Sequence, residues 1–245
     1  MIEAKNLTLH YGGSQILHGI DLVARPGEVT CVMGNNGVGK TSLMNLLAGR
    51  HPRSGGDITW DGKPLGRLSA QRMARMGVGY VPQGRAIFPM LTVRENLETG
   101  FGCLPRGQRR VPDEIYDSFP VLAEMAHRRG GDLSGGQQQL LAIARALVIR
   151  PRVLLMDEPT EGIQPNIIPQ IGRVIAALRD TGEMAIVLVE QFFDFAWNLG
   201  DRFAVMERGQ VTLSGERSKL ARDDLRQRLM SMAAAAEASG PRGSV

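Results

Sequence analysis

Residues 34–41 read Gly-Asn-Asn-Gly-Val-Gly-Lys-Thr, and this stretch decides the fold. It follows a short apolar run at residues 28–33 and precedes residues 40–50, whose leucines recur at helical spacing. The pattern G-x-x-x-x-G-K-S/T between a strand and a helix predicts a loop that wraps phosphate groups. Its glycines let the backbone turn N–H groups inward, and the helix N-terminus adds partial positive charge.

The phosphate loop predicts that the protein binds a nucleotide together with Mg²⁺. Lys40 would reach the terminal phosphates, and the Thr41 hydroxyl would ligate the metal. The alternative interpretation is a glycine-rich turn with a surface lysine. The loop residues expected to contact the nucleotide are Asn35, Asn36, Gly37, Val38, Gly39, Lys40, Thr41 and Ser42.

Two carboxylates follow a second apolar run. Residues 153–156 read Val-Leu-Leu-Met, which is typical of a strand buried in a parallel sheet, and Asp157 and Glu158 come next. Both acids would emerge at the carboxyl edge of the sheet, beside the phosphate loop. We expect Asp157 to hold Mg²⁺, directly or through water, and Glu158 to polarise the attacking water as general base. Without the phosphate loop, the two acids would be interpreted as a helix cap.

Strands and helices alternate along most of the chain, which predicts an α/β fold with a mainly parallel sheet. The first two strands, with Gly12 and Gly13 between them, predict an antiparallel β unit. These two strands are expected at residues 2–9 and 20–23. Further strands are expected at residues 57–60, 78–81, 185–189, 203–207 and 210–213, and helices at 69–75, 134–149 and 167–179.

A polar helical pattern at residues 91–129, broken by three prolines, predicts an inserted helical subdomain. We therefore expect one domain over residues 1–245. Its nucleotide-binding core with the antiparallel β subdomain would take residues 1–84 and 151–232, and the helical subdomain residues 85–150. The alanine-rich end at residues 233–245 is expected to be a flexible tail.

Residues 133–137 read Leu-Ser-Gly-Gly-Gln, and a serine with two glycines at a helix start creates a second anion-binding site. One chain needs only one phosphate loop, and alone this stretch would be interpreted as an N-cap. Together with the loop and the acidic pair, it resembles the signature of the ABC ATPase family. In that family the signature contacts the γ-phosphate of nucleotide held by a partner subunit. The matching residues are Ser134, Gly135, Gly136 and Gln137.

The resemblance covers nearly the whole chain, in the family's order, and adds two residues. Tyr11 matches an aromatic that stacks on adenine, and Gln83 matches a glutamine that reaches Mg²⁺ and the attacking water. The alternatives are a turn aromatic packed on the core and a polar residue ending a strand. In the family the glutamine also links the site to the helical subdomain that contacts the membrane partner.

Two positions depart from the common family pattern. Gln164 stands where an aspartate often reaches across the dimer, and Gln191 stands where many members have a histidine that contacts the γ-phosphate. A glutamine can donate a hydrogen bond there but carries no charge, so hydrolysis could be slower or depend on the partner. Both departures resemble the branched-chain amino-acid and urea importers. Residues 84–92, 128–132 and 161–165 look closest to the second ATPase of urea importers.

The resemblance implies an ATPase that uses ATP and Mg²⁺ to drive an importer. It implies two transmembrane permease subunits, a related ATP-binding subunit or a second copy of this chain, and an external solute-binding protein. The chain would work at the cytoplasmic face of the inner membrane as a peripheral subunit. Its N-terminal residues show no secretion signal, and it has no run of 18 to 20 apolar residues.

Composition sets limits on the other functions. Apolar residues at 43 % and charged residues at 22 % are globular values. The net charge of +4 comes from 29 basic and 25 acidic residues that are interspersed, so we expect no nucleic-acid partner. Cys31 and Cys103 lie in no metal or disulfide pattern and are expected to be inert thiols.

Two other functions remain open from the sequence. Gln164 and Gln191 are compatible with a regulatory partner that binds ATP and hydrolyses little, although Lys40 and Glu158 are both present. A DNA-repair or ribosome-associated ABC ATPase would share the cassette. Such proteins usually carry a long coiled-coil insert or two cassettes, and this chain shows neither pattern.

Overall fold

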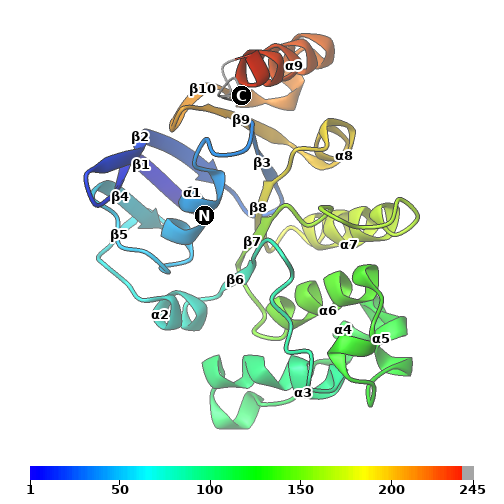
Figure 1. Cartoon of the computed structure of the whole chain (residues 1–245). Helices are drawn as coiled ribbons and strands as arrows, with labels where there is room; N and C mark the ends of the chain where they lie inside the picture. Colours follow the sequence, from blue (N-terminus) through cyan, green and yellow to red (C-terminus); the bar gives the residue numbers. More distant parts are fainter. Residues whose placement is uncertain (239–245) are drawn as a thin grey trace, which may run out of the picture.

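The computed structural model describes residues 1–238, and within them the strands form two sheets (Figure 1). A four-stranded antiparallel sheet has the order β2-β1-β4-β5, and a six-stranded sheet has the order β10-β9-β3-β8-β7-β6. The strands are β1 Ile2–Tyr11, β2 Ser14–Ala24, β3 Val29–Met33, β4 Gly55–Trp60, β5 Lys63–Leu65, β6 Val78–Val81, β7 Val153–Asp157, β8 Ala185–Val189, β9 Arg202–Glu207 and β10 Gln210–Glu216.

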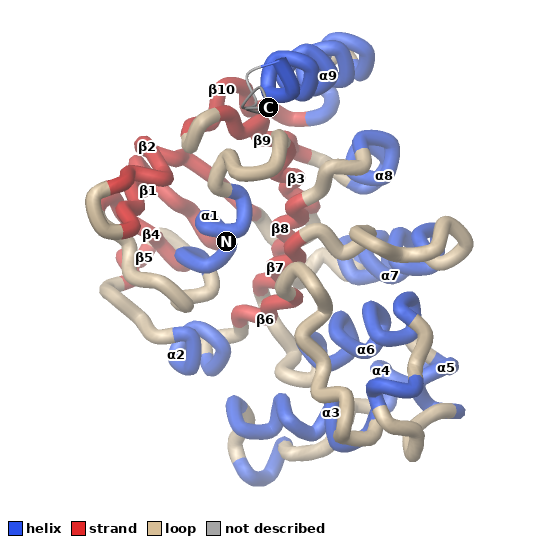
Figure 2. Tube along the Cα trace, viewed as in Figure 1, coloured by secondary structure: helices blue, strands red, loops and turns tan. Residues whose placement is uncertain are grey.

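Helices pack around the larger sheet and form a separate group at one end (Figure 2). The helices are α1 Lys40–Leu47, α2 Ala70–Arg75, α3 Val93–Glu98, α4 Asp113–Ser118, α5 Pro120–Glu124, α6 Gly135–Leu147, α7 Ile168–Asp180, α8 Phe193–Leu199 and α9 Arg222–Ala238. Short 3₁₀ turns occupy Thr99–Cys103, Arg106–Gln108, Gly130–Asp132 and Arg217–Lys219.

The six-stranded sheet is parallel from β9 through β6, with β10 antiparallel at its edge. Both of its faces are covered, so successive residues of one strand enter different cores. On β7, Leu154 and Met156 join the core under α6 and α7, whereas Val153 and Leu155 join the core under α1 and the antiparallel sheet. This two-sided burial explains the unbroken apolar runs in the sequence. The predicted α/β fold is confirmed.

The segment between β6 and β7 leaves the sheet, forms α3 to α6 and then returns to the neighbouring parallel position. Figure 1 shows these helices grouped below the sheet, away from the antiparallel strands. A parallel pair needs a crossover connection, and here that connection is long enough to add its own apolar residues to the core on one face of the sheet. Phe119 and Leu122 are fully buried in it, and α6 joins it to the sheet.

Two details differ from or extend the sequence-based expectation. Strand β2 begins at Ser14 rather than at residue 20, because residues 14–19 pair with the end of β1. Helix α9 continues through residues 233–238, where alanine has the highest intrinsic helix propensity. The remaining expected tail, 239–245, lies outside the described residues.

The described helices contain no segment long and apolar enough to cross a membrane. Cys31 is buried, Cys103 is partly buried, and neither forms a disulfide. Burial raises the pKa of the Cys31 thiol above its ordinary value, which keeps it protonated at neutral pH.

Candidate active site

The phosphate loop connects the carboxyl end of β3 to the start of α1, and its backbone requires glycine. Gly34 has φ +148° and Gly39 has φ +103°, a region in which other residues are strained. A Cβ on Gly34 would lie 2.3 Å from the carbonyl oxygen of Met206, and one on Gly39 would lie 2.8 Å from a Leu17 methyl. The glycines at these positions are therefore dictated by close packing against β9 and β2.

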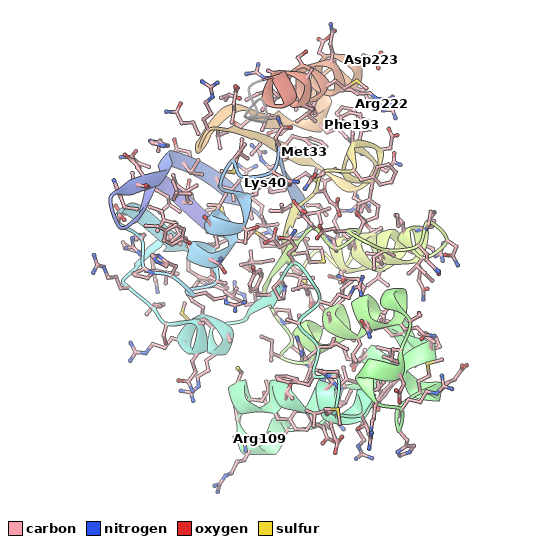
Figure 3. All side chains as sticks on the ribbon, in the orientation of Figure 1. Met33, Lys40, Arg109, Phe193, Arg222 and Asp223 are labelled. Carbon is pink, nitrogen blue, oxygen red and sulfur yellow. The ribbon has the colours of Figure 1, made fainter. Side chains whose placement is uncertain are left out.

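Lys40 opens α1 and is 4 % exposed, near the centre of the molecule (Figure 3). Its Nζ donates to the carbonyl oxygens of Gly34 at 2.8 Å and Asn35 at 2.9 Å. The same ammonium lies 3.4 Å from Glu158 Oε1, which is itself 7 % exposed. The lysine is thus folded over its own loop, with a buried positive charge beside the candidate general base.

Glu158 is the point at which the predicted catalytic residues meet. Its Oε1 accepts a hydrogen bond from Gln191 Nε2 at 2.7 Å, and its Oε2 lies 3.4 Å from Gln83 Nε2. With Lys40, three donors from three different elements surround one carboxylate. The backbone of Glu158 has φ +50°, and its N–H donates to the Val189 carbonyl of the adjacent strand. A left-handed glutamate is strained, and such strain is common at functional sites.

Asp157 ends β7 and is 1 % exposed. Among the described residues, neither of its carboxylate oxygens has a hydrogen-bond partner of good geometry. Burial raises the pKa of this carboxyl, and the nearby hydroxyls of Thr41 and Tyr80 and the Lys40 ammonium oppose that rise. An unpaired buried carboxylate is costly unless a cation joins it.

A hard divalent cation fits these donors. Mg²⁺ prefers oxygen ligands and is commonly held by one carboxylate, a hydroxyl and the substrate phosphates. Asp157 and Thr41 offer such a pair, with Gln83 on the neighbouring strand end. The described residues contain no cluster of three or more His, Cys, Asp or Glu that would hold a metal alone. When bound, Mg²⁺ would neutralise charge on the phosphates.

Gln191 lies on a loop that reaches the phosphate loop as well as Glu158. Its amide also donates to Asn36 Oδ1. The next helix, α8, is held by α9, because Arg222 donates to Asp194 at 2.7 Å and lies over the Phe193 ring at 5.9 Å. Figure 3 shows Phe193 and Arg222 on these two adjacent helices. The Gln191 amide therefore links the candidate base to the phosphate loop.

The other predicted loop residues occupy the same segment. Asn35 donates to the Met232 carbonyl of α9 at 2.8 Å, and the Val38 carbonyl accepts from Gly209 N–H. Gly37 has φ +79° and is exposed, and Ser42 is partly buried in the first turn of α1. These contacts hold the loop between the C-terminal helix and the β9–β10 turn.

Tyr11 and Gln164 lie outside the cluster around Glu158. Tyr11 ends β1, is 42 % exposed, and its ring is in a T-shaped arrangement with His51, with 4.8 Å between the centroids. An exposed ring near the turn after α1 is free to stack on a planar ligand. Gln164 is exposed on the loop before α7.

The signature residues form a closed local structure at the start of α6. Ser134 caps the helix by accepting from Gln137 N–H at 3.3 Å, and the Gln137 side chain accepts from Ser134 N–H at 2.9 Å. This reciprocal pair is a capping box. Gly135 and Gly136 follow it, with Gly136 packed so closely on Ile167 that a Cβ would lie 2.7 Å from that side chain. Within the described structure these residues belong to the helical group, away from the phosphate loop (Figure 1).

Sequence reasoning missed three residues near the base. Glu190 is 2 % exposed and binds Thr160 through both carboxylate oxygens. Tyr80, on β6, places its hydroxyl close to Asp157. Glu190 alone had a detectable signal, since a glutamate directly after five buried strand residues needs polar partners.

A comparison with protein families finds the model described as ABC transporter over residues 17–161. The high-affinity branched-chain amino acid transport ATP-binding protein BraG of Pseudomonas aeruginosa is 37 % identical over 214 residues, which are 87 % of this chain and 91 % of BraG. The glutamine transport ATP-binding protein GlnQ of Escherichia coli is 34 % identical over 234 residues, covering 94 % of this chain and 97 % of GlnQ.

A solved dimeric ATP-binding cassette in a post-hydrolysis state with ADP and Pi is also similar. It is 26 % identical, has a TM-score of 0.78, and covers 89 % of this chain and 99 % of its own. A parallel sheet whose carboxyl edge carries a phosphate loop and two acids defines a P-loop ATPase. The chain belongs to the ABC transporter family, as its ATP-binding domain, and its predicted ATPase activity is confirmed.

Proposed function

We propose that this chain is the ATP-hydrolysing subunit of an ABC importer. The observation that carries the proposal is the convergence of Lys40, Gln83 and Gln191 on the buried carboxylate of Glu158, beside a phosphate loop. The importer assignment is supported by Gln191, by residues 161–165, and by the likeness to two amino-acid transport ATP-binding proteins.

In this proposal Glu158 is the general base and takes a proton from the attacking water. Lys40 stabilises charge on the terminal phosphate, and the amides of Gln83 and Gln191 orient the base and the water. Asp157 and Thr41 would hold Mg²⁺, which would neutralise charge on the phosphates. The Glu158 carboxylate lies 3.4 Å from the Lys40 ammonium, so the proposed base and the lysine of the phosphate loop face the same site.

The signature helix supports a dimer as the working unit. In the described structure Ser134 to Gln137 begin α6 in the helical group, away from the phosphate loop, and backbone N–H groups at a helix N-terminus are an anion site. A second ATP-binding subunit would bring its signature to this chain's nucleotide. That subunit is a second copy of this chain or a related ATPase. The similar post-hydrolysis cassette is dimeric, which supports this arrangement.

The helical group supplies a surface for the membrane partner. Phe88 is 49 % exposed and Met90 is 72 % exposed on the loop that follows Gln83. Arg145 of α6 lies over the Phe88 ring at 5.3 Å, and Asn96 binds the Phe88 backbone at both its N–H and carbonyl. An ordered loop with exposed apolar tips is suited to a protein contact. It would connect Gln83 to one of two transmembrane permease subunits at the cytoplasmic face of the membrane.

Urea is the solute that the sequence pattern favours, and branched-chain amino acids are the alternative that the likeness to BraG favours. The ATPase does not touch the solute, which an external solute-binding protein would deliver. The test is to purify the chain with its neighbouring gene products and measure ATPase in membranes with urea or leucine. Glu158→Gln provides the blank.

The outcomes of this test identify the solute and decide whether the chain belongs to an importer. Stimulation by urea alone supports the urea importer. Stimulation by leucine alone moves the protein to the amino-acid importers with the same mechanism. If no permease co-purifies and nucleic acid stimulates turnover, the importer proposal is wrong.

A further inference from the structure

Glu190 lies between two loops of the active site. It follows β8, directly before Gln191, and is 2 % exposed. On one side is Thr160, two residues after Glu158, and on the other are the backbone N–H groups of the loop that carries Gln191. Its own N–H donates to the carbonyl of Val32, at the end of the strand that leads into the phosphate loop.

The Glu190 carboxylate accepts hydrogen bonds from both loops. Its Oε1 accepts from Thr160 N–H at 3.1 Å and from the Thr160 hydroxyl at 2.8 Å, and that hydroxyl also lies 3.0 Å from Oε2. Oε2 accepts from Gln191 N–H at 3.1 Å and from Phe192 N–H at 3.4 Å. Among the described residues no Lys or Arg forms an ion pair with it.

The partners of Glu190 require that both of its side-chain oxygens act as hydrogen-bond acceptors. Three backbone N–H groups converge on the carboxylate, and a backbone N–H can only donate. An ionised carboxylate accepts at both oxygens, whereas an amide would turn an NH₂ donor toward one of the loops. A glutamate at this position therefore matches its surroundings in a way that glutamine does not.

Because Thr160 belongs to the same short segment as Glu158, its hydrogen bonds to Glu190 also restrain the backbone at Glu158. Glu161 N–H donates to the Glu158 carbonyl at 3.1 Å, and Ile163 N–H donates to the Thr160 carbonyl at 3.2 Å, so residues 158–163 form consecutive turns. Glu161 also accepts from Gln83 at 2.9 Å. Fixing Thr160 thus fixes the left-handed backbone at Glu158 and the carboxylate that holds Gln83.

We propose that Glu190 is a positioning residue for ATP hydrolysis, which sets the distance between Glu158 and Gln191 by tying Thr160 to the Gln191 loop. The inference rests on the proposed roles of Glu158 and Gln191. Glu190 does not touch the nucleotide or the attacking water. Its effect belongs in the catalytic step and not in ATP binding.

The test compares variants on each side of the link in the purified full-length chain. Glu190→Gln and Thr160→Val should each lower kcat about tenfold or more, with KM for ATP within about twofold of the wild type, because a small displacement of a base slows chemistry more than binding. Thr160→Ser keeps the hydroxyl and should restore most of kcat. The double variant should lose no more than Glu190→Gln alone, since both changes break one link.

Thr30→Val is the matched control. Thr30 is also 2 % exposed and donates its hydroxyl to a backbone carbonyl, that of Val23 at 3.0 Å, but it lies within β3, before the phosphate loop. It should leave kcat within about twofold of the wild type. If Thr30→Val slows hydrolysis as much as Thr160→Val does, then the removal of any buried threonine hydroxyl lowers kcat, and the proposal is wrong.

Glu158→Gln separates this inference from the proposed site. If Glu158→Gln is inactive while folded Glu190→Gln and Thr160→Val keep the wild-type kcat, the positioning role is overturned and the base assignment stands. If Glu158→Gln is itself fully active, the proposed base is wrong and the link has no catalytic purpose. The positioning role would also be overturned if the double variant lost kcat by the product of the two single-variant losses, because Glu190 and Thr160 would then act independently.

Discussion

At the phosphate loop, side chains from four separate segments meet around Glu158, whereas at the start of α6 the side chains of Ser134 and Gln137 each accept from the other residue's backbone N–H. The first region depends on tertiary structure. The second is satisfied by contacts within one turn of a helix. Both regions nevertheless belong to the same proposed chemistry, the binding of ATP phosphates from opposite sides.

The two regions also differ in how many energetically unfavourable features they contain, both buried charges and strained backbone. Near the loop, the Asp157 oxygens lack partners of good geometry among the described residues, Glu158 adopts φ +50°, and burial raises the pKa of Glu190 to about 7. The capping box on α6 contains no ionisable group. The loop region is therefore arranged for ligands at some cost in stability, and the signature region is stable without them.

The largest expected effect tests the base at the centre of the loop region. Glu158→Gln should lower kcat by roughly 10²–10⁴-fold, because the amide cannot accept a proton from water. ATP binding should persist, since Lys40 and the loop amides remain. Steady-state ATPase and ATP-dependent thermal shift measure the two quantities.

Glu183→Gln is the control for that change, because Glu183 is exposed on the loop before β8, at the opposite end of that strand from Glu190 and Gln191. It should hydrolyse ATP at the wild-type rate. If Glu158→Gln hydrolyses ATP at the wild-type rate, Glu158 is not the general base. Its contacts with Lys40, Gln83 and Gln191 would then only stabilise the fold.

A second prediction concerns the pH dependence of stability. The folded Glu190 carboxyl has a pKa of about 7, because burial outweighs its hydrogen bonds to Thr160 and to the N–H groups of the following loop. The unfolded chain binds fewer protons between about pH 4.5 and 7, so the free energy of unfolding falls as pH rises through this window, by up to about 3 kcal/mol. Glu190→Gln should remove that part of the decline.

Urea unfolding at pH 5 and pH 8 without nucleotide gives the comparison. Relative to the wild type, Glu190→Gln should be more stable at pH 8 than at pH 5. Asp157, whose pKa burial also raises, contributes the same sign of pH dependence to both proteins and cancels in the difference. A constant difference across this range would contradict the assignment to Glu190.

A third, smaller effect is expected at the proposed metal carboxylate. Asp157→Asn removes a buried charge whose oxygens have no hydrogen-bond partner of good geometry among the described residues, so without nucleotide and Mg²⁺ the variant should be more stable by about 1–2 kcal/mol. The Mg²⁺ concentration for half-maximal ATPase should rise about tenfold or more. Thermal unfolding and a Mg²⁺ titration measure these changes. Lower stability of the variant would mean that Asp157 is paired within the protein.

The sequence was sufficient for the parts of the molecule that local pattern controls. The phosphate loop, the two-sided apolar strands and the helix start at Ser134 each follow from a short run of residues, because glycine geometry, burial and capping act locally. The helical group between β6 and β7 could be expected from three prolines in a polar helical pattern.

Contacts between distant segments could not be predicted in the same way. The Glu190–Thr160 link joins residues 30 positions apart, and Asn35 reaches Met232 across 197 positions. Neither pair has a spacing signal, because the sheet order that brings them together is a property of the whole fold. The pairing of Gln191 with Glu158 likewise gives the glutamine a partner that no motif predicts.

The smallest expected effect tests the self-contained region directly. Ser134→Ala and Thr92→Ala each remove the serine or threonine of a capping box in the helical group, since Thr92 and Glu95 form the same reciprocal pair at α3. Both should lower the free energy of unfolding by about 1 kcal/mol. Only Ser134→Ala should also lower ATPase at saturating ATP, by about tenfold, because a signature hydroxyl would donate to phosphate held by the partner subunit. Equal ATPase in the two variants, measured beside urea unfolding, would reduce Ser134 to a helix cap.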